Sequence, residues 1–269
     1  MHLDGNGWVE CGCRARHWGR HGAAGLYLCV DDHVLLQLRP GWAHQGGTWA
    51  IPGGARDSHE TVIAAALREA QEETAIDPEQ VTVSGVHRLQ HPDWRYDTVL
   101  ATATKRPVVS EHAESVELAW VAISRLSQMD LHPGFAASLP ALQLPQLRLI
   151  IDAANVVGSV ADGWWRDRVG ATERLLTALD PRVGQSGTWE GEEHLLSYVE
   201  VVVEGKARAV PDRCLDSLLI LTRAPAAGDD TIAERARNVS AVVVTSDRGL
   251  RDRVARSVSV SHFRKAVEV

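Results

Sequence analysis

The sequence has few cysteines and no long apolar run, and each shortage excludes a class of protein. Four cysteines in 269 residues do not make a disulfide framework. No apolar run approaches the roughly 18 residues that a membrane-spanning helix needs. The N-terminus lacks the basic and apolar regions of a signal peptide. We therefore expect a soluble, cytoplasmic protein that binds no membrane.

Positive charge is also in short supply. The chain carries 28 Lys and Arg against 35 Asp and Glu, which gives a net charge of −7. An acidic balance argues against non-specific binding to duplex nucleic acid. The hydrophobic fraction of 45% is that of a globular protein, and the length suits two domains.

The two halves of the chain follow different patterns and predict two α/β domains. The first half has short strands around one helix, including an apolar hairpin at 25–39 whose turn is Asp31-Asp32. The second half has apolar runs at 147–152, 198–203, 218–221 and 241–245 and a helix expected over 164–179, as in a doubly wound domain with a parallel sheet. Two prolines mark the linker, so we expect domains over 1–140 and 148–269 and a linker over 141–147.

The stretch GGARDSHETVIAAALREAQEETAI, which begins at Gly53, predicts a helix with an unusual acidic face. Apolar residues at 63, 66, 67 and 70 form one stripe to be buried, and Asp57 followed by Glu60 is typical of a capping box that starts the helix there. Beside the stripe, Glu69, Glu72 and Glu73 share a face on which like charges repel. Carboxylates grouped in this way suit Mg²⁺ or Mn²⁺, and the alternative is a solvated acidic face.

The complete pattern resembles the Nudix (MutT-like) box: Gly54, Glu60 and the run REAQEETAI from Arg68 to Ile76. The preceding segment QGGTWAIPGG also agrees, and the resemblance covers roughly residues 8–140. It implies an α/β/α sandwich with a mixed sheet that cleaves a nucleoside diphosphate derivative by attack of water at phosphorus. It also implies that Glu69, Glu72 and Glu73 bind the metal. Arg68, beside them, can pair with Glu60 and fix the turn below, so we expect these five residues to form the catalytic set. The general base would be one of these glutamates or, outside the box, Glu111 or Glu114.

One position departs from the family pattern, which has glycine where this chain has Ala75. A glycine after a helix suits a left-handed C-cap, so we expect Ala75 to adopt that conformation at a cost of about 1 kcal/mol.

The sequence says less about the substrate than about the metal site. Arg39 ends a strand near the box and could reach a phosphate, Trp49 could stack on a base, and Gly54, in the box itself, is the third residue expected to bind substrate. The alternatives are a surface arginine and a core tryptophan. Cys11, Cys13 and His17 resemble part of a zinc site, but no fourth ligand is evident in the sequence.

In the second half, aspartates follow the predicted strands. Asp152 ends one strand, with Asn155 nearby; Asp229-Asp230 and Asp247 begin helices. Each aspartate alone is as well explained as a helix N-cap. Together they resemble the PIN-like nucleases of the NYN group, which implies a divalent metal, Mg²⁺ or Mn²⁺, and cleavage of RNA. Glu204 could join them, and the pair Trp164-Trp165 could stack on single-stranded RNA.

These patterns leave three functions open. The first is a metal-dependent Nudix pyrophosphohydrolase acting on a nucleoside diphosphate derivative, with a C-terminal domain that cuts RNA. In the second, the Nudix domain senses a nucleotide and regulates an RNA-cleaving or RNA-binding module. In the third, the C-terminal domain is catalytically silent and holds RNA or another partner.

Overall fold

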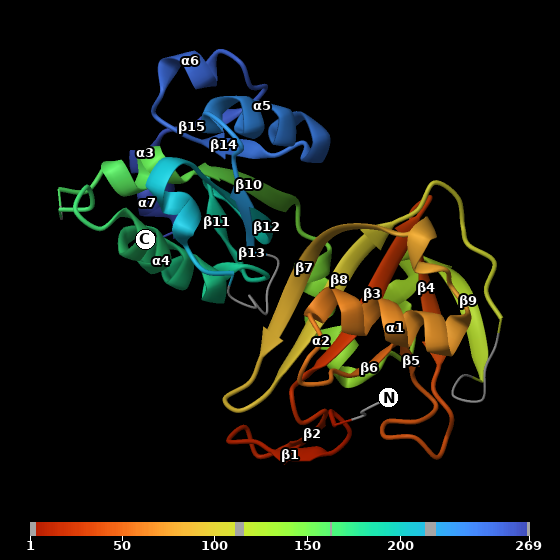
Figure 1. The fold of residues 1–269 in the computed structure, drawn as a ribbon. Helices are drawn as coiled ribbons and strands as arrows, with labels where there is room; N and C mark the ends of the chain where they lie inside the picture. The colour runs from red at the N-terminus through yellow and green to blue at the C-terminus, as the bar shows by residue number, and fades with distance from the viewer. Residues whose placement is uncertain (1–3, 111–115, 162, 213–218, 268–269) are drawn as a thin grey trace. The chain divides into compact units, whose positions relative to one another are not determined.

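The computed structural model describes all residues except 1–3, 111–115, 162, 213–218 and 268–269. The chain forms two compact units, Met1–Gln143 and Leu144–Val269 (Figure 1). Among the described residues, no helix combines the length and the apolar character needed to cross a bilayer.

The first unit is built on a mixed seven-stranded sheet in which β5, β4, β3, β8 and β7 lie in this order. Its centre is the parallel pair β3–β8, while β6 pairs with β3 and β9 with β4 in antiparallel fashion. The strands are β3 Ala23–Val30, β4 His33–Leu38, β5 Trp49–Ala50, β6 Gly53–Ala55, β7 Thr82–Gln90, β8 Arg95–Thr102 and β9 Glu117–Ala122. A separate hairpin precedes them, made of β1 Trp8–Glu10 and β2 Arg16–Trp18.

The predicted β3–β4 hairpin is confirmed. Val30 pairs with His33, so its loop is the two residues Asp31 and Asp32. Their φ angles of 51° and 56° are both left-handed. Such a turn matches the twist of the flanking strands, and aspartate tolerates the conformation better than most residues.

Helix α1 (Val62–Thr74) packs on β3, β6 and β8, and it begins later than the sequence indicated. Thr61 is its N-cap and accepts the Ala64 amide at 3.1 Å, whereas the expected start was at Asp57. Glu60 does reach back to the Asp57 amide, at 3.0 Å, but this contact closes the turn before the helix. The buried face also differs from the expected stripe and consists of Val62, Ala65, Ala66, Ala70, Glu73 and Thr74.

The end of α1 agrees with expectation. Ala75 is the C-cap, with φ 60° and ψ 18°, and its amide donates to the Gln71 carbonyl at 2.9 Å. The unit continues through η1 (Pro78–Gln80) and η2 (Ile123–Gln128) to α2 (Pro133–Leu142). Because α2 contains Pro140 and β10 starts at Gln146, only 143–145 lie between these elements, where a linker over 141–147 was expected.

The second unit has a sheet whose strands β13, β12, β10, β14 and β15 are parallel, with β11 antiparallel to the start of β12. The chain starts at the central strand β10, adds β12 and β13 on one side, and then adds β14 and β15 on the other. This places a topological switch point between β10 and β14. The strands are β10 Gln146–Asp152, β11 Ser186–Trp189, β12 Glu192–Val203, β13 Leu219–Arg223, β14 Val242–Val244 and β15 Ser257–Val258.

Apolar side chains of β10, β12, β14 and α5 form a core that includes Ile150, Val202, Ile232 and Val243. The expected helix over 164–179 starts only at Arg168, because Asp167 caps it by accepting the Gly170 amide at 2.8 Å. The helices are α3 Ala153–Gly158, α4 Arg168–Leu179, α5 Gly228–Val239, α6 Arg248–Arg251 and α7 Val260–Val267, with short turns η3 Asp180–Arg182 and η4 Gly205–Ala209.

Candidate functional site

The three glutamates of α1 have different surroundings. Glu73 is buried at 6% exposure, and one of its oxygens accepts Gln37 Nε2 at 2.9 Å and the Gly53 amide at 2.7 Å. The side chain of Glu69 is 14% exposed and that of Glu72 is 48% exposed. The sequence placed all three beside the buried stripe, but Glu73 belongs to the buried face because β4 and β6 supply donors to its carboxylate.

Arg68 is the cation that faces the acidic side of the helix. Its Nη1 lies 2.7 Å from Glu69 and 3.1 Å from Glu72, and its Nε lies 2.7 Å from Glu60. Nη2 also donates to the Ala55 carbonyl at 3.0 Å, which ties the helix to the end of β6. The hydrogen bond from Arg68 outweighs burial and lowers the pKa of Glu60, so this pair stays ionised. Arg68 thus offsets part of the repulsion within the acidic face.

The segment before α1 approaches the helix closely. A Cβ added to Gly54 would lie 2.5 Å from Glu69 Oε2, and one added to Gly53 would lie 2.5 Å from the Ala24 carbonyl oxygen. Any side chain at Gly54 would therefore displace the Glu69 carboxylate. The two glycines let the strand pass beside the acidic face, so Gly54 has a steric role here.

Two neighbours of this face were missed from the sequence, Gln37 and Tyr96. Gln37 is 1% exposed and interrupts the apolar residues of the strand HVLLQL. A polar residue at such a position could have been recognised in the sequence as a candidate partner of a buried polar group. Tyr96, on β8, points its hydroxyl at the chain near Gly25 and Gly53. Burial, followed by the nearby carboxylates of Glu73 and Glu69, raises the pKa of this phenol, which keeps it neutral.

The expected substrate residues lie on the strands and loop near this face. Arg39 follows β4, donates from Nε to the His44 carbonyl at 3.2 Å, and acts on Tyr96 and His132 through its charge. Trp49 is half-buried in β5, where it pairs with Leu38. Glu111 and Glu114 lie outside the described residues.

In the second unit, Asp152 ends β10 at the switch point and is 6% exposed. Its carboxylate accepts the Asn155 amide at 3.1 Å, Asn155 Nδ2 at 2.9 Å and Thr245 Oγ1 at 2.9 Å. Burial raises the pKa of Asp152, these hydrogen bonds oppose the rise, and the charge of Glu204 adds to it. Asp152 is therefore both the N-cap of α3 and the centre of a polar network.

The other aspartates divide into two groups. Asp247 caps α6 through the Leu250 amide at 2.8 Å. Burial raises the pKa of Asp229, and the charges of Asp152 and Asp247 raise it further. Asp230 instead pairs with Arg253 at 2.5 Å, because neighbouring residues on a helix point in different directions.

In this structure the carboxylates of each predicted metal site lie farther apart than the ligands of one ion. Neither the α1 glutamates nor Asp152, Asp229 and Asp247 have ligand atoms that all lie within 4.8 Å of one another. Within the described parts of the chain, the groups that do meet this distance are Cys11-Cys13-His17 and Asp4-Asp57-His59. In the second of these groups, Asp4 and Asp57 already accept Ser58 and Gly5, respectively.

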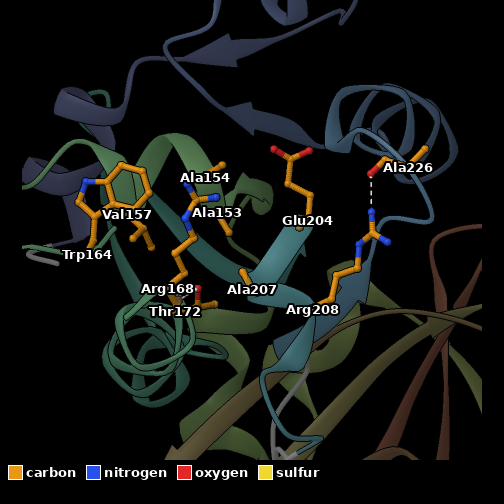
Figure 2. Close-up of a pocket in the computed structure, with 11 residues that line it drawn as sticks. Ala153, Ala154, Val157, Trp164, Arg168, Thr172, Glu204, Ala207, Arg208 and Ala226 are labelled. Atoms are coloured by element: carbon orange, nitrogen blue, oxygen red, sulfur yellow. Dashed lines mark hydrogen bonds between the residues drawn. The ribbon is translucent and has the colours of Figure 1, made fainter. Parts of the chain in front are cut away.

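A cavity of about 320 Å³ borders the aspartates through Glu204 (Figure 2). Trp164 forms one end, with the Arg168 guanidinium 5.2 Å from its ring centre, and Arg208 donates to the Ala226 carbonyl at 2.9 Å near the other end. The indole of Trp165 meets that of Trp164 edge-on, and Trp165 is 55% exposed. Trp164 is thus the half-buried member of the pair and lines the cavity.

Comparison with known proteins agrees with this geometry for the first unit. The family model described as NUDIX domain matches residues 19–142, so it ends before the second unit. A "Putative 8-oxo-dGTP diphosphatase 3" of Mycobacterium tuberculosis is 44% identical over 151 residues, which are 52% of this chain and 70% of the relative. A "Nucleoside triphosphate pyrophosphatase/Nudix hydrolase fusion protein" of Bifidobacterium longum is 40% identical over 163 residues, 54% of this chain and 34% of the relative.

Among solved structures, the Nudix hydrolase RenU from M. smegmatis is 45% identical and covers 52% of this chain and 93% of its own, with a TM-score of 0.48. The family match spans residues 19–142, which include Glu60, Arg68 and the three glutamates of α1. This chain therefore belongs to the Nudix family of hydrolases.

Proposed function

We propose that the first unit hydrolyses a phosphoanhydride bond of a nucleoside diphosphate derivative, with Mg²⁺ or Mn²⁺ held by Glu69, Glu72 and Glu73. The observation that carries this proposal is the acidic face of α1 with its surroundings. Arg68 clamps Glu69 and Glu72 from one side, and Gln37 and the Gly53 amide fix Glu73 from the other. All donors are carboxylate oxygens, which fit a hard divalent cation.

When bound, the cation would neutralise the substrate phosphates and orient the attacking water. The chain's own residues do the positioning. Arg68 and Glu60 set the distance between α1 and β6, and Gly54 leaves the space in which the Glu69 carboxylate sits. Arg39, just after β4, is our candidate for a phosphate contact, and Trp49 for a contact with the base.

For the substrate, the first compound to test is 8-oxo-dGTP, because the mycobacterial relative carries that name and is 44% identical. It belongs to the expected class, since a nucleoside triphosphate is a nucleoside diphosphate linked to a further phosphate. Release of phosphate or pyrophosphate from 8-oxo-dGTP and dGTP, and of AMP from ADP-ribose, each measured with Mg²⁺ or Mn²⁺, would identify the preferred derivative.

The residue test is Glu72→Gln, because Glu72 is the most exposed of the three and its removal disturbs packing least. We expect turnover to fall by about a hundredfold or more, since one anionic ligand is lost from a site that depends on metal charge. The matched control is Glu79→Gln, on the exposed turn η1. Equal turnover in both variants would mean that the acidic face is only solvated surface.

We also propose that the second unit is a PIN-like domain of the NYN group that cuts RNA with a divalent metal. Three observations support it: the parallel strand order, the position of Asp152 at the switch point, and the charges of Asp152 and Asp247 that act on Asp229. Asp230 leaves the expected ligand set because it pairs with Arg253. Glu204 joins the set, since its charge reaches both Asp152 and Asp229.

The neighbouring cavity would accept a nucleotide of the RNA. Trp164 and Arg168 at its end offer a ring face and a cation, which suit a base and a phosphate. We place single-stranded RNA there, with the carboxylates on the Glu204 side of the cavity.

This proposal is tested in the full chain carrying Glu72→Gln, which silences the first site. Millimolar Mn²⁺ should raise the melting temperature, because bound metal relieves repulsion among the carboxylates. Adding Asp152→Asn should blunt this rise and abolish metal-dependent RNA cleavage, whereas Asp230→Asn should do neither. If neither Mn²⁺ nor Mg²⁺ changed the melting temperature, the aspartates would be ordinary helix caps and the domain would be a binding module.

A further inference from the structure

The N-terminal hairpin β1–β2 brings two thiols and an imidazole together. Its turn is closed by hydrogen bonds from the Cys11 amide to the Ala15 carbonyl at 3.1 Å and from the Arg14 amide to the Cys11 carbonyl at 2.9 Å. Cys13 Sγ lies 3.1 Å from His17 Nε2, and the ligand atoms of Cys11, Cys13 and His17 all lie within 4.8 Å of one another. Cys11 is buried at 9% exposure, whereas Cys13 is exposed, so the group lies at the surface with one thiol covered.

A distant segment, the turn between β7 and β8, closes over the same group. The Gly12 amide donates to Asp93 Oδ2 at 2.7 Å, and the Asp93 amide points at Cys11 Sγ at 3.5 Å. The His17 ring stacks on Trp94, with centres 4.4 Å apart and planes at 9°. The same turn places the His91 ring centre 4.3 Å from that of His17.

We propose that Cys11, Cys13, His17 and His91 form a tetrahedral zinc site that fastens the hairpin to the β7–β8 turn. Two thiolates and two imidazoles are a common zinc ligand set, and they are poor ligands for Mg²⁺. Tetrahedral zinc bonded to S and N at its usual distances needs ligand atoms about 3.3–3.8 Å apart. The first three ligands already approach that spacing, and His91 completes the set by a rotation of its half-buried side chain.

The sequence alone hid this site because the fourth ligand is 74 positions beyond His17, on another hairpin. His91 takes the fourth place in preference to Asp93, because an oxygen of the Asp93 carboxylate is already engaged by the Gly12 amide. The amide of Asp93 aimed at Cys11 Sγ is a contact that would stabilise a thiolate ligand.

The fold gives this site a structural purpose. β1 and β2 are three-residue strands that form a sheet of their own, and an isolated hairpin of this kind is at best marginally stable in water. A metal that joins the hairpin to the main sheet supplies the missing stabilisation. Zinc would also fix Trp8, whose ring lies 5.2 Å from His44 in the loop after Arg39.

The first test measures metal in the purified full chain, kept in millimolar Mg²⁺ so that the α1 glutamates are not counted. We expect about one zinc ion per chain. After exchange with Co²⁺, the visible spectrum should show thiolate-to-cobalt charge transfer and the strong d–d bands of four-coordinate cobalt. A chain that carries no zinc and gives no thiolate–cobalt bands overturns the proposal, as does a Cys11–Cys13 disulfide as the only resting state after reducing purification.

Variants then assign the ligands. Cys11→Ser and Cys13→Ser should lose most of the zinc, whereas Cys29→Ser, on β3, is the matched control and should keep it. His91→Ala should weaken zinc in chelator competition and change the cobalt d–d bands, whereas Asp93→Asn should keep those bands. An unchanged spectrum in His91→Ala would remove His91 from the site, and zinc retained by Cys13→Ser would refute the site as a whole.

Discussion

The left-handed C-cap at Ala75 allows one substitution to be tested in two conformations of the same helix. Ala75 has φ 60° and ψ 18° and is exposed, so Ala75→Gly removes a methyl group that packs on nothing. Ala64 is also exposed but lies in the first turn of α1, with right-handed backbone. Ala64→Gly is therefore the matched control for the same loss of a methyl group.

The two substitutions should change the free energy of unfolding differently: Ala75→Gly should leave it equal or raise it, and Ala64→Gly should lower it. Glycine at 75 relieves about 1 kcal/mol of left-handed strain and costs up to about 1 kcal/mol of extra freedom in the unfolded chain. The net effect on the free energy of unfolding is neutral to about 1 kcal/mol stabilising. At Ala64 no strain is relieved, so we expect a loss of about 0.5–1 kcal/mol. The two variants should differ by about 0.5–2 kcal/mol, or about 1–8 °C in melting temperature.

Urea unfolding of the full chain, followed by circular dichroism, measures this difference. Because the chain has two compact units, the transition that shifts in Ala64→Gly identifies the unit Met1–Gln143. If Ala75→Gly lowered the same transition as much as Ala64→Gly does, residue 75 would be helical and the end of α1 at Thr74 would be wrong.

Two further predictions concern charge. Burial, then the nearby charges of Arg39 and His44, lower the pKa of His132 to about 4. Between about pH 6.5 and pH 4, His132 is protonated in the unfolded chain but stays neutral in the folded chain. The free energy of unfolding should therefore fall as the pH drops from about 6.5 to about 4. His132→Asn, which can still cap α2, should show a smaller fall in urea melts at each pH; an identical pH profile would contradict the assigned pKa. In the second unit, Glu200 is fully buried and its carboxylate lies 2.8 Å from Arg235 Nε. Arg235→Met should therefore lower the free energy of unfolding, measured in thermal melts, by about 2–3 kcal/mol. This figure is below that for a fully buried pair because Arg235 is partly exposed. The double variant with Glu200→Gln should recover part of that loss, and no recovery would mean that the buried charge is not the cause.

The sequence by itself determined the features that depend on neighbours along the chain. The acidic face of α1, the left-handed Ala75 and the Asp31-Asp32 turn are local, because spacing along a helix and the backbone preference of a residue are readable without a fold. The continuous apolar runs likewise predicted the parallel sheet of the second unit, since strands buried on both faces are apolar along their whole length.

Only the tertiary structure decided which side chains meet. Glu73 is buried because Gln37 and the Gly53 amide reach it from β4 and β6, and no spacing within α1 could show that. The charges of Asp152 and Asp247 act on Asp229, whereas Asp230 pairs with Arg253, and the packing of α5 decides this difference. His17 and His91 come together because two hairpins dock. Contacts between distant segments depend on packing, and packing is fixed only when all elements of the domain are in place.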